Sequence, residues 1–144
     1  MSKTFQIAID GPVAAGKGTV AKLVAGRLGY LYVDTGAMYR ALTLFVSRRG
    51  VDLKDEGMVV ETLLEQKPKV ELKVPSEEQK DGRLCTVLLN DEDVSWKVRT
   101  EEVSNGVSVI TQYGGVRDLI TPLARKIAMS QGVVMEGRDI TSVV

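Results

Sequence analysis

Hydrophobic residues along the chain follow two alternating spacings. Compact apolar runs indicate buried strands, and apolar residues at every third or fourth position indicate helices. Gly29 is a stop signal for the first helical stretch, and Asp34 or Thr35 can cap the second. The pattern predicts strand 5–9, helix 17–28, strand 30–33, helix 35–50, helix 56–66, helix 100–110, helix 116–129, with a kink or break at Pro122, and strand 132–135. This alternation predicts an α/β fold with a parallel sheet.

Residues 68–98 differ from the rest of the chain. Apolar and charged residues alternate at 70–74 and in parts of 84–89, and Asp81-Gly82 between these two runs is a strong turn signal. Such alternation is typical of antiparallel strands with one polar face. We therefore expect a small antiparallel insert that projects from the main sheet.

Composition limits the chemistry that this chain can perform. Its 144 residues predict one domain over 1–144, and 44% apolar with 26% charged residues is normal for a globular protein. The absence of histidine excludes Ser-His-Asp and Cys-His catalysis and every imidazole metal site. The single cysteine, Cys85, excludes an internal disulfide and suits a reducing compartment. We expect a cytoplasmic protein, because neither a signal peptide nor an apolar run long enough to span a membrane is evident.

The charges cancel over the whole chain but are unevenly distributed. The formal charge is +5 over residues 1–50, −6 over 51–105 and +1 over 106–144. A basic face built from the two ends would favour an anionic ligand, although uneven solvation of surface helices is an equally good interpretation. The balanced total gives no indication of a nucleic-acid partner.

A segment of small residues joins the first predicted strand to the first predicted helix. It reads Gly11-Pro12-Val13-Ala14-Ala15-Gly16-Lys17-Gly18-Thr19, and small residues there let backbone N–H groups approach phosphate oxygens in front of a helix start. Lys17 can reach the β- and γ-phosphates, and Thr19 offers a hydroxyl, whereas Gly18 stands where the strict pattern has Ser or Thr. The segment predicts a nucleoside triphosphate site; the alternative is a glycine-rich turn with an exposed lysine.

Four separated motifs resemble one family of kinases. The GKGT sequence at 16–19 is similar to the phosphate loop of nucleoside monophosphate kinases. The other three motifs match bacterial-type cytidylate kinases in order and spacing, as does the insert at 68–98: Asp34-Thr35-Gly36-Ala37-Met38-Tyr39-Arg40, Arg99-Thr100-Glu101-Glu102-Val103 and Glu136-Gly137-Arg138-Asp139-Ile140. The resemblance extends over essentially the whole chain.

This resemblance implies a fold and an activity. The fold would be the three-layer parallel sheet of P-loop NTPases, with 68–98 as the NMP-binding insert. The enzyme would be a monomer of pyrimidine metabolism that transfers the γ-phosphoryl group of ATP to CMP or dCMP, giving ADP and CDP or dCDP. Magnesium would accompany ATP, held mainly by phosphates and water rather than by a protein metal site.

The resemblance also implies roles for individual residues. Residues 11–19 would bind the ATP phosphates, and Lys17, Arg40 and Arg138 would be the catalytic cations, the two arginines holding the acceptor phosphate. A carboxylate at Asp139 could accept a hydrogen bond from the exocyclic amine of cytosine. The implied substrate-binding residues are Thr35, Arg40, Ser108, Arg117, Arg138 and Asp139.

Most of these residues also have a plainer interpretation. Arg40 could be a surface salt-bridge residue, Thr35 a helix N-cap, and Ser108 or Arg117 a solvated helix residue. Arg138-Asp139 has the best independent case, because ligands collect at the carboxyl ends of strands in open α/β sheets.

The family's mobile lid and adenine-holding segment have no counterpart before Val144. We therefore expect the C-terminal part of the family fold, the lid and last strands, to be absent. A nucleotide-binding remnant without turnover stays open as the alternative to an active kinase.

Overall fold

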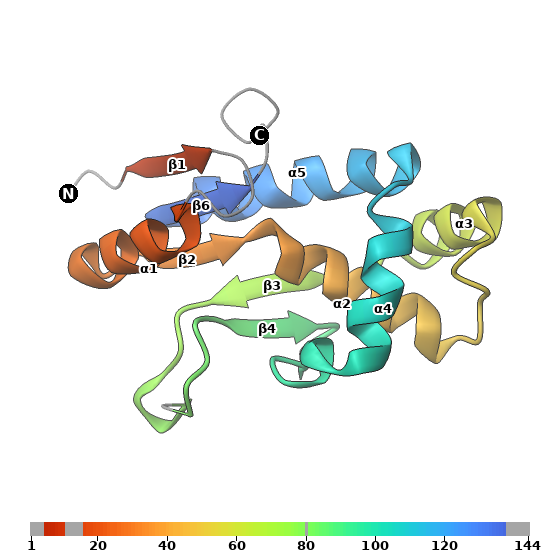
Figure 1. Ribbon diagram of the computed structural model, residues 1–144, viewed down its shortest axis with the longest axis horizontal. Coiled ribbons are helices and arrows are strands. Elements are labelled where there is room, and N and C mark those ends of the chain that lie inside the picture. The colour runs from red at the N-terminus through yellow and green to blue at the C-terminus, as the bar shows by residue number, and fades with distance from the viewer. Residues whose placement is uncertain (1–4, 11–15, 80, 138–144) are drawn as a thin grey trace. The chain divides into compact units, whose positions relative to one another are not determined.

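The computed structural model describes residues 5–10, 16–79 and 81–137 of the chain, as a mixed α/β fold with a parallel sheet (Figure 1). The elements in chain order are β1 (Gln6–Asp10), α1 (Lys17–Leu28), β2 (Leu31–Asp34), α2 (Thr35–Arg48), α3 (Glu56–Gln66), β3 (Val70–Lys73), the 3-10 turn η1 (Glu77–Gln79), β4 (Thr86–Leu89), β5 (Glu92–Asp93), the 3-10 turn η2 (Lys97–Arg99), α4 (Glu101–Ile110), α5 (Gly114–Ser130) and β6 (Val133–Gly137). The predicted alternation of strands and helices is therefore confirmed.

The chain forms two compact units, each assembled from separate stretches of sequence. The first unit contains Met1–Thr35, Leu72–Thr86 and Thr121–Val144, and the second contains Gly36–Glu71 and Val87–Ile120.

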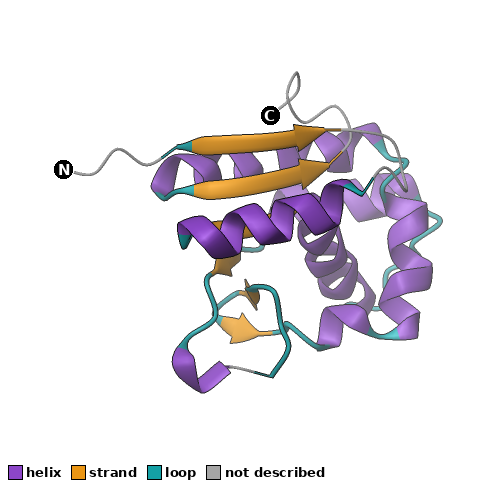
Figure 2. Cartoon of the chain, turned by 60° about the vertical axis from the view of Figure 1, so that its left-hand side comes forward, coloured by secondary structure: helices purple, strands orange, loops and turns teal. Residues whose placement is uncertain are grey.

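The first unit contains the parallel sheet, in the order β1-β6-β2 (Figure 2). Strand β6 is central and pairs in parallel with β1 and with β2. Ala21 and Ala25 of α1 form a buried cluster with Tyr32 of β2 and Val134 of β6. Helix α1 thus lies on the sheet, with small side chains on the face that contacts it (Figure 1).

The second unit is built around helix α2. Its apolar residues recur at helical spacing and bury Met38, Leu42 and Phe45. Asp55 is the N-cap of helix α3, and its carboxylate accepts a hydrogen bond of 3.1 Å from the Met58 N–H. Thr100 is the N-cap of helix α4, and its hydroxyl accepts from the Val103 N–H. Asp and Thr are both residue types that are preferred at a helix N-cap.

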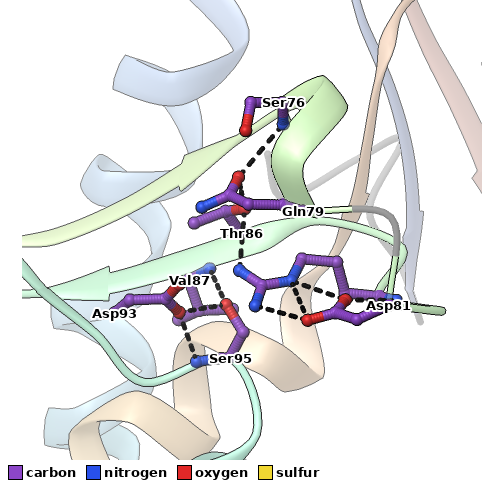
Figure 3. A network of polar contacts seen from close by, with 8 residues as sticks. Ser76, Gln79, Asp81, Thr86, Val87, Asp93 and Ser95 are labelled. Atoms are coloured by element: carbon purple, nitrogen blue, oxygen red, sulfur yellow. Dashed lines mark hydrogen bonds and ion pairs between the residues drawn. The ribbon is translucent and has the colours of Figure 1, made fainter.

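The segment predicted as an insert contains a second sheet, in the order β3-β4-β5. Strands β4 and β5 are antiparallel, with Leu88 opposite Asp93. The seryl hydroxyl of Ser95 donates to Asp93 at 2.6 Å and accepts from the Val87 N–H at 2.9 Å, which fixes the chain after β5 (Figure 3).

The connection from β3 to β4 is longer than a tight hairpin turn. The Gln79 side-chain oxygen accepts from the Ser76 N–H at 3.0 Å and from the Thr86 hydroxyl at 2.9 Å (Figure 3). Arg83 forms two-pronged contacts with Asp81. The turn signal at Asp81-Gly82 therefore marks one bend within a longer, hydrogen-bonded loop rather than the whole connection.

Pro122 does not break the last helix. Helix α5 is continuous from Gly114 to Ser130 with Pro122 inside it, so of the expected kink or break the break is wrong, and the kink stays a prediction. Proline removes one backbone hydrogen bond from a helix. Buried Ile120 and Ala124 lie on either side of it, and burial of that apolar face outweighs the lost bond.

No helix in residues 5–10, 16–79 and 81–137 is long and apolar enough to cross a membrane.

Candidate functional site

Helix α1 starts directly at the predicted phosphate-binding segment. Gly16 is its N-cap, with a φ of 80° in the left-handed region that favours glycine. Lys17 is the first helical residue and Thr19 is exposed in the first turn, while residues 11–15 and the Lys17 side chain lie outside what the structure describes. The first N–H groups of a helix and its dipole attract anions, so the start of α1 is electrostatically favourable for an anion.

Gly18 leaves room for an acidic side chain from the central strand. A Cβ placed on Gly18 would lie 3.0 Å from Oε2 and 3.5 Å from Oε1 of Glu136. The Glu136 carboxylate therefore fills the space into which a serine or threonine at position 18 would project. This contact gives a physical reason for glycine at the position where the strict phosphate-loop pattern has a hydroxyl residue.

Tyr32 holds the Glu136 carboxylate. Its phenol donates a hydrogen bond of 2.6 Å to Glu136 Oε2 from the neighbouring strand β2. Burial, followed by this hydrogen bond and the negative charge of Asp34, raises the pKa of Tyr32 above its ordinary value. The phenol therefore keeps the proton that it donates at neutral pH.

Three parallel strands end side by side with acidic residues near the end of each. Asp34 of β2 lies in register with Glu136 of β6, and Asp10 of β1 lies in register with Gly137. The carboxyl edge of a parallel sheet is where open α/β folds bind ligands. No group of three or more metal-ligating side chains occurs within the described residues. Arg138 and Asp139 lie beyond those residues.

Arg40 occupies an unusual environment in the second unit. Its Nη1 donates hydrogen bonds to the Val98 carbonyl at 3.1 Å and to Ser104 Oγ at 2.8 Å. The side chain is half-buried, and it makes no ion pair with any residue that the structure describes. A guanidinium held by neutral acceptors keeps its full positive charge available for an anion. This environment differs from that of a solvated surface salt bridge.

Two other predicted residues belong to helices of the same unit. Ser108 lies on α4, one helical turn after Ser104, and its exposed hydroxyl donates to the Asn105 carbonyl at 2.8 Å. Arg117 is exposed on α5. Burial raises the pKa of the Tyr39 phenol, and the positive charge of Arg117 opposes this rise. The neighbourhood of Arg40 and Tyr39 on α2 therefore includes polar groups from α4 and α5.

Thr35 is the first residue of α2 and is half-buried. Asp34 is the last residue of β2, and α2 follows it without a connecting loop. Thr35 therefore stands at the carboxyl edge of the sheet, directly after β2.

Sequence reasoning missed two positioning contacts. Ser104, which bonds Arg40, precedes the predicted Ser108 by one helical turn, and this spacing was the only local signal for it. Tyr32 was predicted only as a strand residue, and its bond to Glu136 joins residues 104 positions apart. No local pattern reveals a contact of that kind.

The sequence matches the family model for cytidylate kinase over residues 7–144. The chain belongs to the cytidylate kinase family. Cytidylate kinases from Bacillus licheniformis, Geobacillus sp. strain WCH70 and Bacillus subtilis strain 168 are 48%, 49% and 44% identical to it, each over 97% of this chain. The chain spans 59% of the length of each of these relatives.

Membership of the cytidylate kinase family fits the chemistry of both units. The first unit supplies a helix start that attracts phosphate beside a fixed carboxylate. The second supplies a half-buried guanidinium without an acidic partner among the residues described.

Proposed function

We propose that this chain transfers the γ-phosphoryl group of ATP to CMP or dCMP, giving ADP and CDP or dCDP. Its fold would be that of a P-loop NTPase, with residues 11–19 on the ATP phosphates and the insert at 68–98 beside the monophosphate. Membership of the cytidylate kinase family and the similarity to cytidylate kinases of other bacteria support this assignment. The single buried cysteine fits a cytoplasmic enzyme, which we propose to be monomeric.

The environment of Arg40 carries the proposal. A half-buried guanidinium held by Val98 and Ser104 is oriented in advance and needs an anion to compensate its charge. The phosphate of CMP supplies this anion with a two-pronged acceptor. In the proposal Arg40 and Arg138 hold the acceptor phosphate, Thr35 lies near it, and Ser108, Arg117 and Asp139 recognise the cytosine ring.

The start of α1 supports the ATP half of the proposal. Among the described residues, the Glu136 carboxylate lies beside this helix turn and is held by Tyr32. One such carboxylate fits a nucleotide whose Mg²⁺ would be held mainly by phosphates and water. When bound, the ion neutralises charge on the β- and γ-phosphates. The helix N–H groups and Lys17 would orient the phosphates, and Arg40 would orient the acceptor.

Phosphoryl transfer suits a site without histidine. Positioning of the two nucleotides and neutralisation of charge lower most of the barrier, so no general base with a shifted pKa is required. The cations proposed for this work are Lys17, Arg40 and Arg138.

A coupled ADP-release assay on the purified chain tests the function. ATP with Mg²⁺ is supplied with CMP, dCMP, UMP or AMP in turn, and a reaction without acceptor measures ATP hydrolysis. We expect ADP release to depend on the acceptor and to be fastest with CMP and dCMP. Preference for AMP, or ADP release that is independent of an acceptor, would contradict the assignment.

Calorimetric titration with CMP separates binding from turnover. We expect CMP to bind more tightly than UMP, because a carboxylate can accept from the amine of cytosine but not from the carbonyl of uracil. CMP binding without ADP release would contradict phosphoryl transfer and leave a nucleotide-binding protein.

A further inference from the structure

The contact between Tyr32 and Glu136 connects a buried strand residue to the start of helix α1. The phenol oxygen lies 2.6 Å from Glu136 Oε2. A hydrogen bond from a neutral donor to a carboxylate is short and strong compared with a bond between neutral groups. The same carboxylate oxygen lies closest to the position of a Cβ on Gly18.

The position of the Tyr32 ring is fixed by its surroundings. Tyr32 is buried in a cluster with Ala21 and Ala25 of α1 and Val134 of β6. The Lys22 ammonium lies over the ring, 6.0 Å from its centre. A ring packed in this way has little freedom to rotate about its side-chain bonds, so its hydroxyl is a rigid donor.

The register of the sheet directs this hydroxyl toward the carboxyl edge. Tyr32 lies opposite Val134 and Asp34 lies opposite Glu136, so the phenol has to reach one strand across and two residues along. The length of a tyrosine side chain meets this requirement, whereas a phenylalanine in the same place would pack equally well and donate nothing.

We propose that Tyr32 is a positioning residue of the nucleotide site, whose hydroxyl fixes the Glu136 carboxylate against Gly18 at the start of α1. This inference rests on the proposed function, because it takes the start of α1 to be the site of the ATP phosphates. Tyr32 acts only through Glu136 and does not touch the nucleotide.

The placement of this carboxylate matters because it is negative and stands beside a phosphate site. A carboxylate aimed at phosphate oxygens repels them, whereas one aimed at a bound cation and its water attracts the complex. A free glutamate side chain samples several rotamers and spends time in both arrangements. The phenol of Tyr32 selects one of them. We therefore expect Tyr32 to affect binding of nucleotide with Mg²⁺ and to leave CMP binding unchanged.

The first measurement compares Tyr32→Phe with Tyr30→Phe. Tyr30 is the matched control, because its hydroxyl also makes one cross-strand bond, accepting from the Phe5 N–H at 3.1 Å at the opposite end of the sheet. Calorimetry measures the affinity of the full chain for ADP with and without Mg²⁺. We expect Tyr32→Phe to weaken binding of ADP with Mg²⁺ about tenfold and to leave metal-free ADP within about twofold. Tyr30→Phe should change neither affinity.

The second measurement is a double-mutant cycle with Glu136→Ala. If Tyr32 acts through Glu136, Tyr32→Phe has no further effect on ADP affinity in the Glu136→Ala chain. A Tyr32 effect that persists there, or that Tyr30→Phe reproduces, would overturn the proposal. An unchanged affinity for ADP with Mg²⁺ in Tyr32→Phe would overturn it equally.

Steady-state kinetics supply an independent readout. We expect Tyr32→Phe to raise KM for ATP and to leave KM for CMP unchanged, whereas a general loss of structure would change both. Because ADP binding requires neither CMP nor turnover, the cycle tests Tyr32 even if the unsubstituted chain phosphorylates no CMP. Failure of the proposed function is thus distinguishable from failure of this inference.

Discussion

The guanidinium of Arg40 donates a hydrogen bond of 2.8 Å to the hydroxyl of Ser104, which joins helix α2 to helix α4. Together with the bond to the Val98 carbonyl, this contact uses one of the two terminal nitrogens of Arg40 and fixes the plane of the group. A guanidinium fixed in this way loses little freedom when it binds a phosphate. Ser104 is therefore a positioning residue for the proposed CMP site.

Removal of the Ser104 hydroxyl should weaken CMP binding without affecting ATP. We expect Ser104→Ala to raise KM for CMP about fivefold, because Arg40 then loses one of its two anchors. Ser104→Thr keeps the hydroxyl and should restore most of the affinity. An equal increase in KM for ATP would indicate general damage and contradict this role.

Loss of the Arg40 guanidinium should be more severe. We expect Arg40→Ala to lower kcat/KM for CMP about a hundredfold, because a charged contact to phosphate and its orientation are both lost. Arg27→Ala, which removes an exposed arginine from the last turn of α1, is the matched control. If the two variants lose activity equally in the CMP assay, Arg40 has no special role.

Substitution of Gly18, compared with substitution of Gly26, distinguishes an effect on ATP affinity from an effect on the stability of the helix. Gly18→Ala places a Cβ 3.0 Å from Glu136 Oε2, so we expect the carboxylate to shift by a few tenths of an ångström and ATP affinity to fall several-fold. Gly26→Ala is the control on the same helix, since nothing lies within 4 Å of its added Cβ. It should raise the free energy of unfolding by about 0.5–1 kcal/mol and leave ATP affinity unchanged. Unaltered ATP affinity in Gly18→Ala would contradict the crowding argument.

The contacts of Glu92 should make the folded chain less stable in acid. Arg48 and Lys97 donate to its carboxylate and lower its pKa to about 2 from the usual 4.5. A lowered pKa in the folded chain means that the carboxylate stabilises the fold above pH 4.5 and loses this effect as pH falls toward 2. Glu92→Gln should therefore unfold at lower urea concentration at pH 6 and show a smaller further loss between pH 4.5 and 2.

Urea titrations across this pH range measure the effect of Glu92. The control is Glu65→Gln, which removes an exposed glutamate that has no hydrogen bond or ion pair within the part of the chain described. Because the Glu92 side chain is 42% exposed, salt should weaken the effect. Identical pH profiles for the unsubstituted chain and Glu92→Gln would contradict the ion-pair assignment.

The sequence predicted the secondary structure well because its signals are local. Spacing of apolar residues within a few positions predicted the alternation of strands and helices that the structure shows. Pro122 shows where local signals end. Its local effect opposes a helix, yet α5 continues through it, with Ile120 and Ala124 buried on either side in the sequence.

The same distinction between local and long-range signals applies to the candidate site. Gly16, Gly18 and Arg40 could be selected from sequence because their motifs are contiguous, although the roles proposed for them still require the measurements above. The partners Ser104 and Glu136 could not be assigned, because Arg40 meets Ser104 over 64 positions and Tyr32 meets Glu136 over 104.

The amino-acid sequence by itself determined the α/β alternation, the glycine-rich helix start and membership of the cytidylate kinase family, because each depends on neighbouring residues or on similarity along the chain. The tertiary structure alone decided that Glu136 fills the space above Gly18, that Tyr32 holds it, and that Arg40 is anchored by neutral groups. These relations arise when strand register and helix packing bring distant residues within hydrogen-bonding distance, and no local spacing encodes them.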